Sequence, residues 1–185
     1  MPGQLQDARV LIVTSNTGVE HDELVVPRDR LRQRGARVIH AAEHDAPVRT
    51  YHHDLEPDEE IRPDTTLDAV DPSEVDLLIV PGGTVNADRL RANDYARRLV
   101  RAAAGAWKPI AAVCHGPWLL VDAGVLPGKR LTSYPTLSTD IRNARGEWVD
   151  RPVVRDDSDG WTLITSRRPA DLPDFVDAIT RELTD

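Results

Sequence analysis

The chain has one cysteine among its 185 residues, so it cannot form an internal disulfide bond. The lack of disulfides suits a reducing compartment, and we predict a cytoplasmic location. The sequence also lacks any apolar run that approaches the roughly 20 residues needed to span a bilayer. Its first seven residues are polar and lack the basic and apolar regions of a signal peptide. We therefore expect no association with a membrane.

An excess of positive charge is absent too, because the formal net charge is −8. Binding to nucleic acid needs a basic face, so a general nucleic-acid partner is excluded. Metal-ligand spacing is also missing. His52 and His53 are neighbours in a polar stretch, and adjacent residues do not naturally converge on one ion. The sequence thus predicts neither a metal nor another cofactor.

Short apolar runs bounded by turn residues recur along the chain and predict buried, mostly parallel strands. Strand, helix and strand follow one another at the spacing of a right-handed βαβ unit. The expected strands cover residues 10–14, 36–41, 75–80, 109–113, 130–133, 149–155 and 161–165. The expected helices cover residues 20–35, 94–101, 118–124 and 169–183. The predicted fold is a single domain over residues 1–185, a flavodoxin-like three-layer α/β/α sandwich.

Residues 43–71 show neither the helical nor the strand period. Their central part, from Tyr51 to Glu60, is acidic and polar. A stretch of this length and composition is usually a surface loop, and a lid over a site is the alternative.

Cys114 lies where the strand at 109–113 gives way to a short helix. Small residues, Ala112 and Gly116, stand two positions before and after it. The nucleophile elbow of hydrolases makes the same steric demand, because a tight, strained turn exposes its nucleophile. The N-terminus of the following helix carries partial positive charge, which favours the reactive thiolate. We therefore interpret Cys114 as a reactive cysteine rather than a small apolar core residue.

Two other segments follow predicted strands, as Cys114 does: the pair Gly82–Gly83 and residues 20–23. In open α/β sheets, ligands bind beyond the carboxyl ends of strands, so these segments could share one crevice. The backbone N–H groups of Gly83 and His115 could stabilise an oxyanion there. An acid from residues 20–23 could bond the sulfur and move protons, although acids are also common in the first turn of a helix.

Several motifs in this sequence closely resemble the PfpI family. That family belongs to the class I glutamine amidotransferase-like superfamily, alongside the parkinsonism-associated deglycase. The motifs are VPGG at 80–83, VCHGP at 113–117, AGVL at 123–126, TSYP at 132–135, EWVD at 147–150 and SRRPADL at 166–172. The resemblance covers nearly the whole chain.

The resemblance implies roles for four residues. Cys114 matches the family's elbow nucleophile, and Glu23 matches the carboxylate that holds its sulfur. His115 follows the nucleophile as in PfpI-type members, where an acid from a neighbouring subunit contacts it. Asp88 best matches that acid, although it is an aspartate where the archaeal protease has a glutamate. The other pocket residues that we expect are Gly82, Glu20, Trp118 and Pro135.

A glutaminase is excluded, because such enzymes take their catalytic histidine from a strand downstream of the cysteine. Apart from His115, every histidine here lies before Cys114. A downstream proton shuttle is therefore missing.

Three functions remain open. The resemblance implies a stress-response enzyme for reactive carbonyls, which converts methylglyoxal to lactate or removes early glycation adducts from proteins. The second is an intracellular cysteine peptidase whose site is completed by Asp88 from a neighbouring subunit. The third is a non-catalytic, redox-sensing or chaperone-like stress protein, in which the cysteine is oxidised to a sulfinate. We favour the first. The expected partners are small aldehydes, glycated proteins or peptides, and further copies of the chain in a homodimer or larger homo-oligomer.

Overall fold

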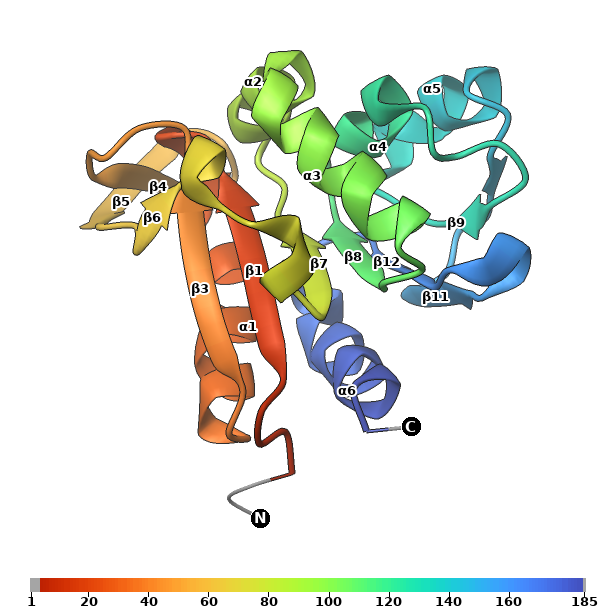
Figure 1. Cartoon of the computed structure of the whole chain (residues 1–185). Helices are drawn as coiled ribbons and strands as arrows, with labels where there is room; N and C mark the ends of the chain where they lie inside the picture. The colour runs from red at the N-terminus through yellow and green to blue at the C-terminus, as the bar shows by residue number, and fades with distance from the viewer. Residues whose placement is uncertain (1–3, 185) are drawn as a thin grey trace.

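A computed structural model describes residues 4–184 and has a seven-stranded central sheet with helices on both faces (Figure 1). The strand order is β11-β12-β8-β7-β1-β3-β6. All neighbouring pairs run parallel except β11 and β12, which are antiparallel. The strands are β1 (Arg9–Thr14), β3 (Arg37–Ala42), β6 (Thr65–Thr66), β7 (Leu77–Val80), β8 (Ile110–Val113), β11 (Val153–Asp156) and β12 (Leu163–Ser166).

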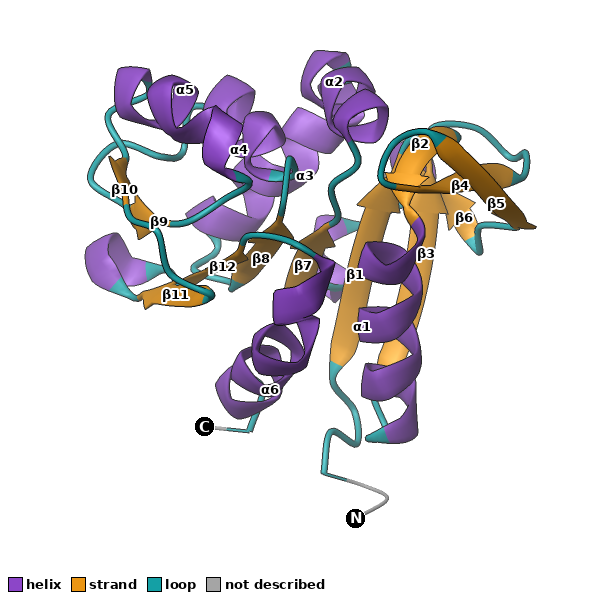
Figure 2. Cartoon of the chain, turned by 180° about the vertical axis from the view of Figure 1, so that it is seen from behind, coloured by secondary structure: helices purple, strands orange, loops and turns teal. Residues whose placement is uncertain are grey.

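The alternation of side chains along β1 explains the layers. Val10 and Ile12 pack on one face with residues of α1 and α6, whereas Leu11 and Val13 pack on the other with residues of α2 to α5. Figure 2 shows α1 and α6 together on the face seen from behind. The helices are α1 (His21–Gln33), α2 (Thr84–Ala92), α3 (Asp94–Gly105), α4 (Pro117–Ala123), α5 (Ser138–Asn143) and α6 (Leu172–Glu182). The predicted three-layer α/β/α fold is confirmed.

Residues 43–71 are ordered, so the prediction of an irregular loop is wrong. Strands β4 (Val48–His52) and β5 (Glu56–Ile61) form an antiparallel hairpin, and β4 pairs in parallel with β2 (Thr17–Glu20). Nearly every residue of β5 is exposed. Its sequence therefore lacks the apolar alternation that marks a half-buried strand. We call residues 48–61 the insert hairpin.

Two smaller elements also differ from the expectation. Helix α2 has no counterpart among the predicted helices, because its buried residues are only Asn86, Ala87 and Leu90. The strand expected at 130–133 is short. As β9 (Arg130–Leu131) it pairs with β10 (Glu147–Trp148), apart from the central sheet.

Successive strands are added to the sheet on one side of β1 first and on its other side afterwards. The chain runs outward from β1 to β3 and β6, and then returns to β7 on the other side of β1. Ligands bind at such topological switch points, so the carboxyl ends of β1, β7 and β8 mark the expected site. No helix within residues 4–184 has the length and apolar character required to cross a membrane.

Candidate active site

Cys114 occupies a strained turn immediately after β8. Its φ is 59°, a left-handed conformation that costs a non-glycine residue roughly 1–3 kcal/mol. Hydrogen bonds hold the turn: the Cys114 N–H donates to the Ser166 carbonyl at 3.0 Å, and the Tyr134 N–H donates to the Cys114 carbonyl at 2.8 Å. A Cβ on Gly116 would stand 2.4 Å from the Val80 carbonyl oxygen. The spacing of small residues in the sequence predicts a tight turn at this place, and glycine is required for it.

Glu23 lies in the first turn of α1 and is 0% exposed. Its Oε2 accepts a hydrogen bond from the Gly82 N–H at 2.7 Å, and its carboxyl also interacts with the Cys114 thiol. Burial, above all, raises the pKa of Glu23 to about 8. Its second oxygen, Oε1, is buried without a well-formed hydrogen bond to any residue in 4–184. Near neutral pH this carboxyl is therefore mainly protonated.

Gly82 makes the meeting of acid and thiol sterically possible. A Cβ at this position would lie 2.6 Å from Glu23 Oε2 and 2.7 Å from Cys114 Cβ. Such distances are well below van der Waals contact, so a larger residue would push the two side chains apart.

The backbone N–H groups of Gly83 and His115 face the Cys114 sulfur and act to lower the pKa of its thiol. These are the two donors that the sequence predicts for an oxyanion. Cys114 is nevertheless only 7% exposed, and burial raises the pKa of its thiol, as would a negative charge on Glu23. Burial therefore opposes the lowering of the thiol pKa that the helix N-terminus was expected to cause. The reason is desolvation, which the sequence pattern does not display.

His115 packs directly against the turn. Its Nδ1 lies 3.2 Å from Cys114 Sγ, and its ring stacks on Tyr134 with 4.7 Å between centroids. Trp118, one of the predicted pocket residues, meets the same ring edge-on at 5.3 Å, while its Nε1 donates to Asp140 Oδ2 at 2.9 Å. Burial lowers the pKa of His115, so the imidazole is neutral near pH 7.

The acid connected to His115 within one chain is Asp54, in the turn of the insert hairpin. His115 Nε2 lies 3.4 Å from Thr84 Oγ1, and Thr84 donates its hydroxyl and its backbone N–H to Asp54, each at 2.7 Å. Asp88 is exposed on α2, and no hydrogen bond or ion pair joins it to His115 among the described residues of a single chain. A contact of Asp88 across a subunit boundary stays a prediction.

The remaining predicted pocket residues occupy neighbouring loops. Glu20 ends β2, and its Oε2 accepts a hydrogen bond from the His53 N–H at 3.0 Å. Gly83 has a φ of 83°, and a Cβ there would stand 2.0 Å from the Gly18 carbonyl oxygen. This close approach joins β2 to the loop after β7. Pro135 begins a short 3₁₀ turn directly after Tyr134, the residue whose ring stacks on His115.

Sequence reasoning missed four residues that build this site. Asn86 is buried, and it accepts from the Ser15 N–H at 2.8 Å while donating to the carbonyls of Pro81 at 3.2 Å and Gly82 at 3.0 Å. The available signal was an asparagine three residues after the pair Gly82–Gly83, because its side chain offers both a donor and an acceptor. The others are Asp54, Thr84 and Tyr134.

Direct access to the sulfur is narrow, since Cys114 is nearly buried. A surface cavity of about 510 Å³ opens elsewhere, beside β1 and β3, and is lined by residues that include Arg9, Arg37 and Asp71. Cys114 is not among its lining residues. The geometry at the turn therefore suits a small reacting group better than a bulky one.

The fold and the site together define a flavodoxin-like α/β protein with a cysteine at a strand-to-helix turn and a buried acid beside it. The model of the DJ-1/PfpI family matches residues 8–182. The chain belongs to the DJ-1/PfpI family.

Proteins with known names resemble the chain over most of its length. A deglycase of Pyrococcus horikoshii is 39% identical over 164 residues, which are 89% of this chain and 92% of the relative. General stress protein 18 of Bacillus subtilis is 39% identical over 116 residues, 63% of this chain and 65% of the relative. The crystal structure of Drosophila melanogaster DJ-1beta has a TM-score of 0.84 and 32% identity, and the match covers 96% of this chain and 90% of the other.

Proposed function

We propose that this chain is a cysteine-dependent stress enzyme that acts on reactive carbonyls, as a protein deglycase or as a cofactor-free glyoxalase. The observation that carries the proposal is the buried pair of Glu23 and Cys114. A carboxyl with a pKa of about 8 is matched to proton transfer near neutral pH. Relatives named as a deglycase and as a general stress protein support the same class of function.

In the proposed reaction, Cys114 adds to the aldehyde carbon of methylglyoxal. The S–C bond forms, the C=O π bond breaks, and the thiol proton ends on oxygen to give a hemithioacetal. The N–H groups of Gly83 and His115, which act on the pKa of the Cys114 thiol, are the proposed donors to the developing oxyanion.

Glu23 then moves a proton between adjacent carbons of the adduct. The ionised fraction of Glu23 takes the proton from the former aldehyde carbon, and the ketone oxygen gains a proton, which gives an enediol. Glu23 then gives its proton to the neighbouring carbon while the hydroxyl on the sulfur-bearing carbon loses its proton, so the product is a thioester of lactate. Water hydrolyses the thioester, which releases lactate and restores the thiol. In the deglycase version, Cys114 attacks the carbinol carbon of the protein adduct, and the S–C bond forms as the bond from that carbon to the protein nitrogen or sulfur breaks. The protein amino or thiol group leaves with the proton of the Cys114 thiol, and the resulting hemithioacetal follows the same steps to lactate.

A specific contact favours a cysteine peptidase as the second candidate. His115 Nδ1 lies 3.2 Å from Cys114 Sγ, which is near the reach of a general base. In that function a third group must orient the imidazole. Within one chain the connected acid is Asp54 through Thr84, and across subunits the candidate is Asp88.

Parallel assays separate these functions. Wild type, Cys114→Ser, Glu23→Gln and His115→Asn are tested with methylglyoxal, with glyoxal-modified cysteine peptides and with casein. We expect Cys114→Ser and Glu23→Gln to lose lactate formation and peptide repair, with far-UV circular dichroism unchanged. His44→Ala, an exposed histidine outside the site, is the control. Casein cleavage that His115→Asn abolishes would favour the peptidase. Wild-type protein that neither forms lactate nor repairs the peptides would overturn the carbonyl proposal.

A further inference from the structure

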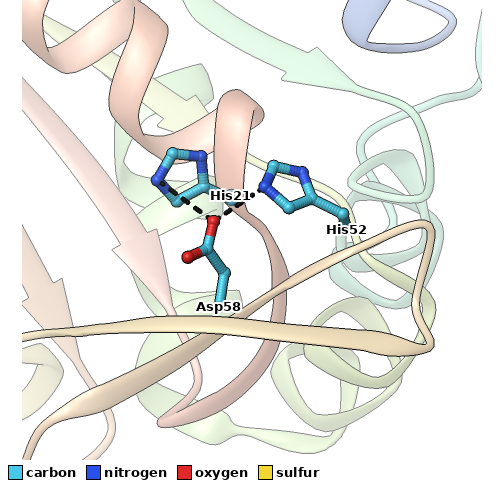
Figure 3. Close-up of side chains that lie close together, drawn as sticks. All are labelled: His21, His52 and Asp58. Atoms are coloured by element: carbon cyan, nitrogen blue, oxygen red, sulfur yellow. Dashed lines mark hydrogen bonds and ion pairs between the residues drawn. The ribbon is translucent and has the colours of Figure 1, made fainter.

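Three side chains from different elements converge between α1 and the insert hairpin (Figure 3). His21 opens α1, His52 ends β4 and Asp58 lies in β5. Asp58 Oδ2 lies 2.7 Å from His52 Nε2 and 3.9 Å from His21 Nε2. One possible ligand atom from each residue lies within 4.8 Å of the other two. The sequence did not reveal this cluster, because the histidine near His52 in space is His21 of α1 and not its sequence neighbour His53.

The spacing fits a small divalent ion. Zinc binds imidazole nitrogen and carboxylate oxygen at roughly 2.0–2.2 Å, which places tetrahedral ligand atoms roughly 3.4 Å apart. The separations of 2.7 and 3.9 Å from Asp58 Oδ2 bracket that value. Two imidazoles and one carboxylate form a known zinc donor set that leaves one position open. Glu59 Oε1, at 3.1 Å from His21 Nε2, lies beside this position.

Further carboxyl groups lie behind the imidazoles. His21 Nδ1 is hydrogen-bonded to Asp22 Oδ1 at 2.8 Å, an arrangement that leaves Nε2 free to act as a ligand. His52 Nδ1 lies 3.9 Å from Glu20 Oε1. A carboxylate behind a ligating histidine fixes the ring and raises its basicity, and such pairs recur around protein-bound metals.

The acids of this cluster are not neutralised by other side chains. No arginine or lysine in residues 4–184 forms an ion pair with Asp22, Asp58 or Glu59; their ion-pair partners are His21 and His52. Two half-buried imidazoles among carboxylates that no arginine or lysine neutralises form a negative site with nitrogen donors. Such a site favours a borderline divalent cation over Mg²⁺ or Ca²⁺, which prefer oxygen ligands alone.

We propose that His21, His52 and Asp58 bind a divalent transition metal of the zinc type. The ion would replace the direct hydrogen bond between His52 and Asp58 and connect α1 to both strands of the insert hairpin. This site is separate from the Cys114 turn, and the proposal does not depend on the carbonyl chemistry.

The test measures Zn²⁺ binding by calorimetry on full-length protein without a histidine tag. Cys114→Ser serves as the background, because a thiol can also bind zinc. We expect one Zn²⁺ per chain, and a visible Co²⁺ spectrum typical of nitrogen and oxygen ligands. His52→Ala and Asp58→Asn should each weaken binding at least about 100-fold, and Asp22→Asn about 10–100-fold.

Matched controls are His44→Ala and His53→Asn. Both histidines are exposed and lie outside the cluster, and asparagine tolerates the left-handed backbone of His53, whose φ is 53°. Both controls should bind zinc as the background protein does. Circular dichroism of each metal-free variant checks that it is folded. An absence of saturable Zn²⁺ binding, or equal binding by His52→Ala and Asp58→Asn, would show that the cluster is only a hydrogen-bond network.

Discussion

Replacing Glu23 with glutamine should remove a pH dependence from the stability of the protein. Burial raises the pKa of Glu23 to about 8, whereas a glutamate in an unfolded chain has a pKa of about 4.3. Between these values the folded protein holds a proton that the unfolded chain has released. Stability is therefore greatest below the unfolded pKa, and it falls by about 1.4 kcal/mol per pH unit as the pH rises. From pH 6 to pH 8 the loss is about 2 kcal/mol, since the group is half ionised at the upper limit.

Urea unfolding followed by tryptophan fluorescence measures this loss at pH 6, 7 and 8. The range stays below the usual pKa of a cysteine thiol, about 8.5, so ionisation of Cys114 adds little. We expect the free energy of unfolding of Glu23→Gln, relative to wild type, to rise by about 2 kcal/mol across the range. Asp88→Asn, at an exposed position, should follow wild type. If wild type and Glu23→Gln instead run parallel, Glu23 is already ionised in the folded protein and the argument fails.

Three further predictions concern the surrounding structure. Gly83→Ala should destabilise the protein by more than about 2 kcal/mol in urea unfolding, because its Cβ would stand 2.0 Å from the Gly18 carbonyl oxygen. The control Gly105→Ala has open space at the end of α3 and should stabilise the protein by up to about 1 kcal/mol. Burial lowers the pKa of His40 to about 4, so the contribution of the neutral imidazole to the free energy of unfolding is complete above pH 6.5 and is lost as the pH falls toward 4. In an acid titration, His40→Gln should therefore unfold with a midpoint at lower pH than wild type. An unchanged midpoint would contradict this. Asp54→Ala should cost about 1 kcal/mol by removing both hydrogen bonds to Thr84, and thermal unfolding that matches wild type would contradict that role.

Much of the fold could be predicted because its central strands are buried on both faces. Strands β7 and β8 are continuous apolar runs, and such runs are readable without any knowledge of their neighbours. The insert hairpin escaped prediction because β5, with the sequence EPDEEI, is held by backbone pairing to β4 and not by burial. Helix α2 was not predicted from the sequence because few of its side chains are buried.

For the site, the sequence predicted which residues come together better than it predicted their charge states. Gly83 and Cys114 follow the neighbouring strands β7 and β8, and Glu23 lies in α1 directly after β2, whose Glu20 N–H donates to the Gly82 carbonyl, so the topology brings the three together. The charge state could not be predicted, because it depends on how much water reaches Cys114 and Glu23. Likewise, the link from Asp54 to His115 requires a hairpin whose existence the pattern did not reveal.

The insert hairpin shares no strand with the central sheet, yet its turn reaches the N-terminal end of α2 through Asp54. Strand β8 and the Cys114 turn are held by other partners, chiefly β7, β12 and the Tyr134 backbone. Changes in the length or charge of this hairpin therefore act on His115, through Asp54 and Thr84, without rebuilding the framework that carries the sulfur. For the proposed enzyme, the hairpin is the place to begin a search for an altered substrate preference.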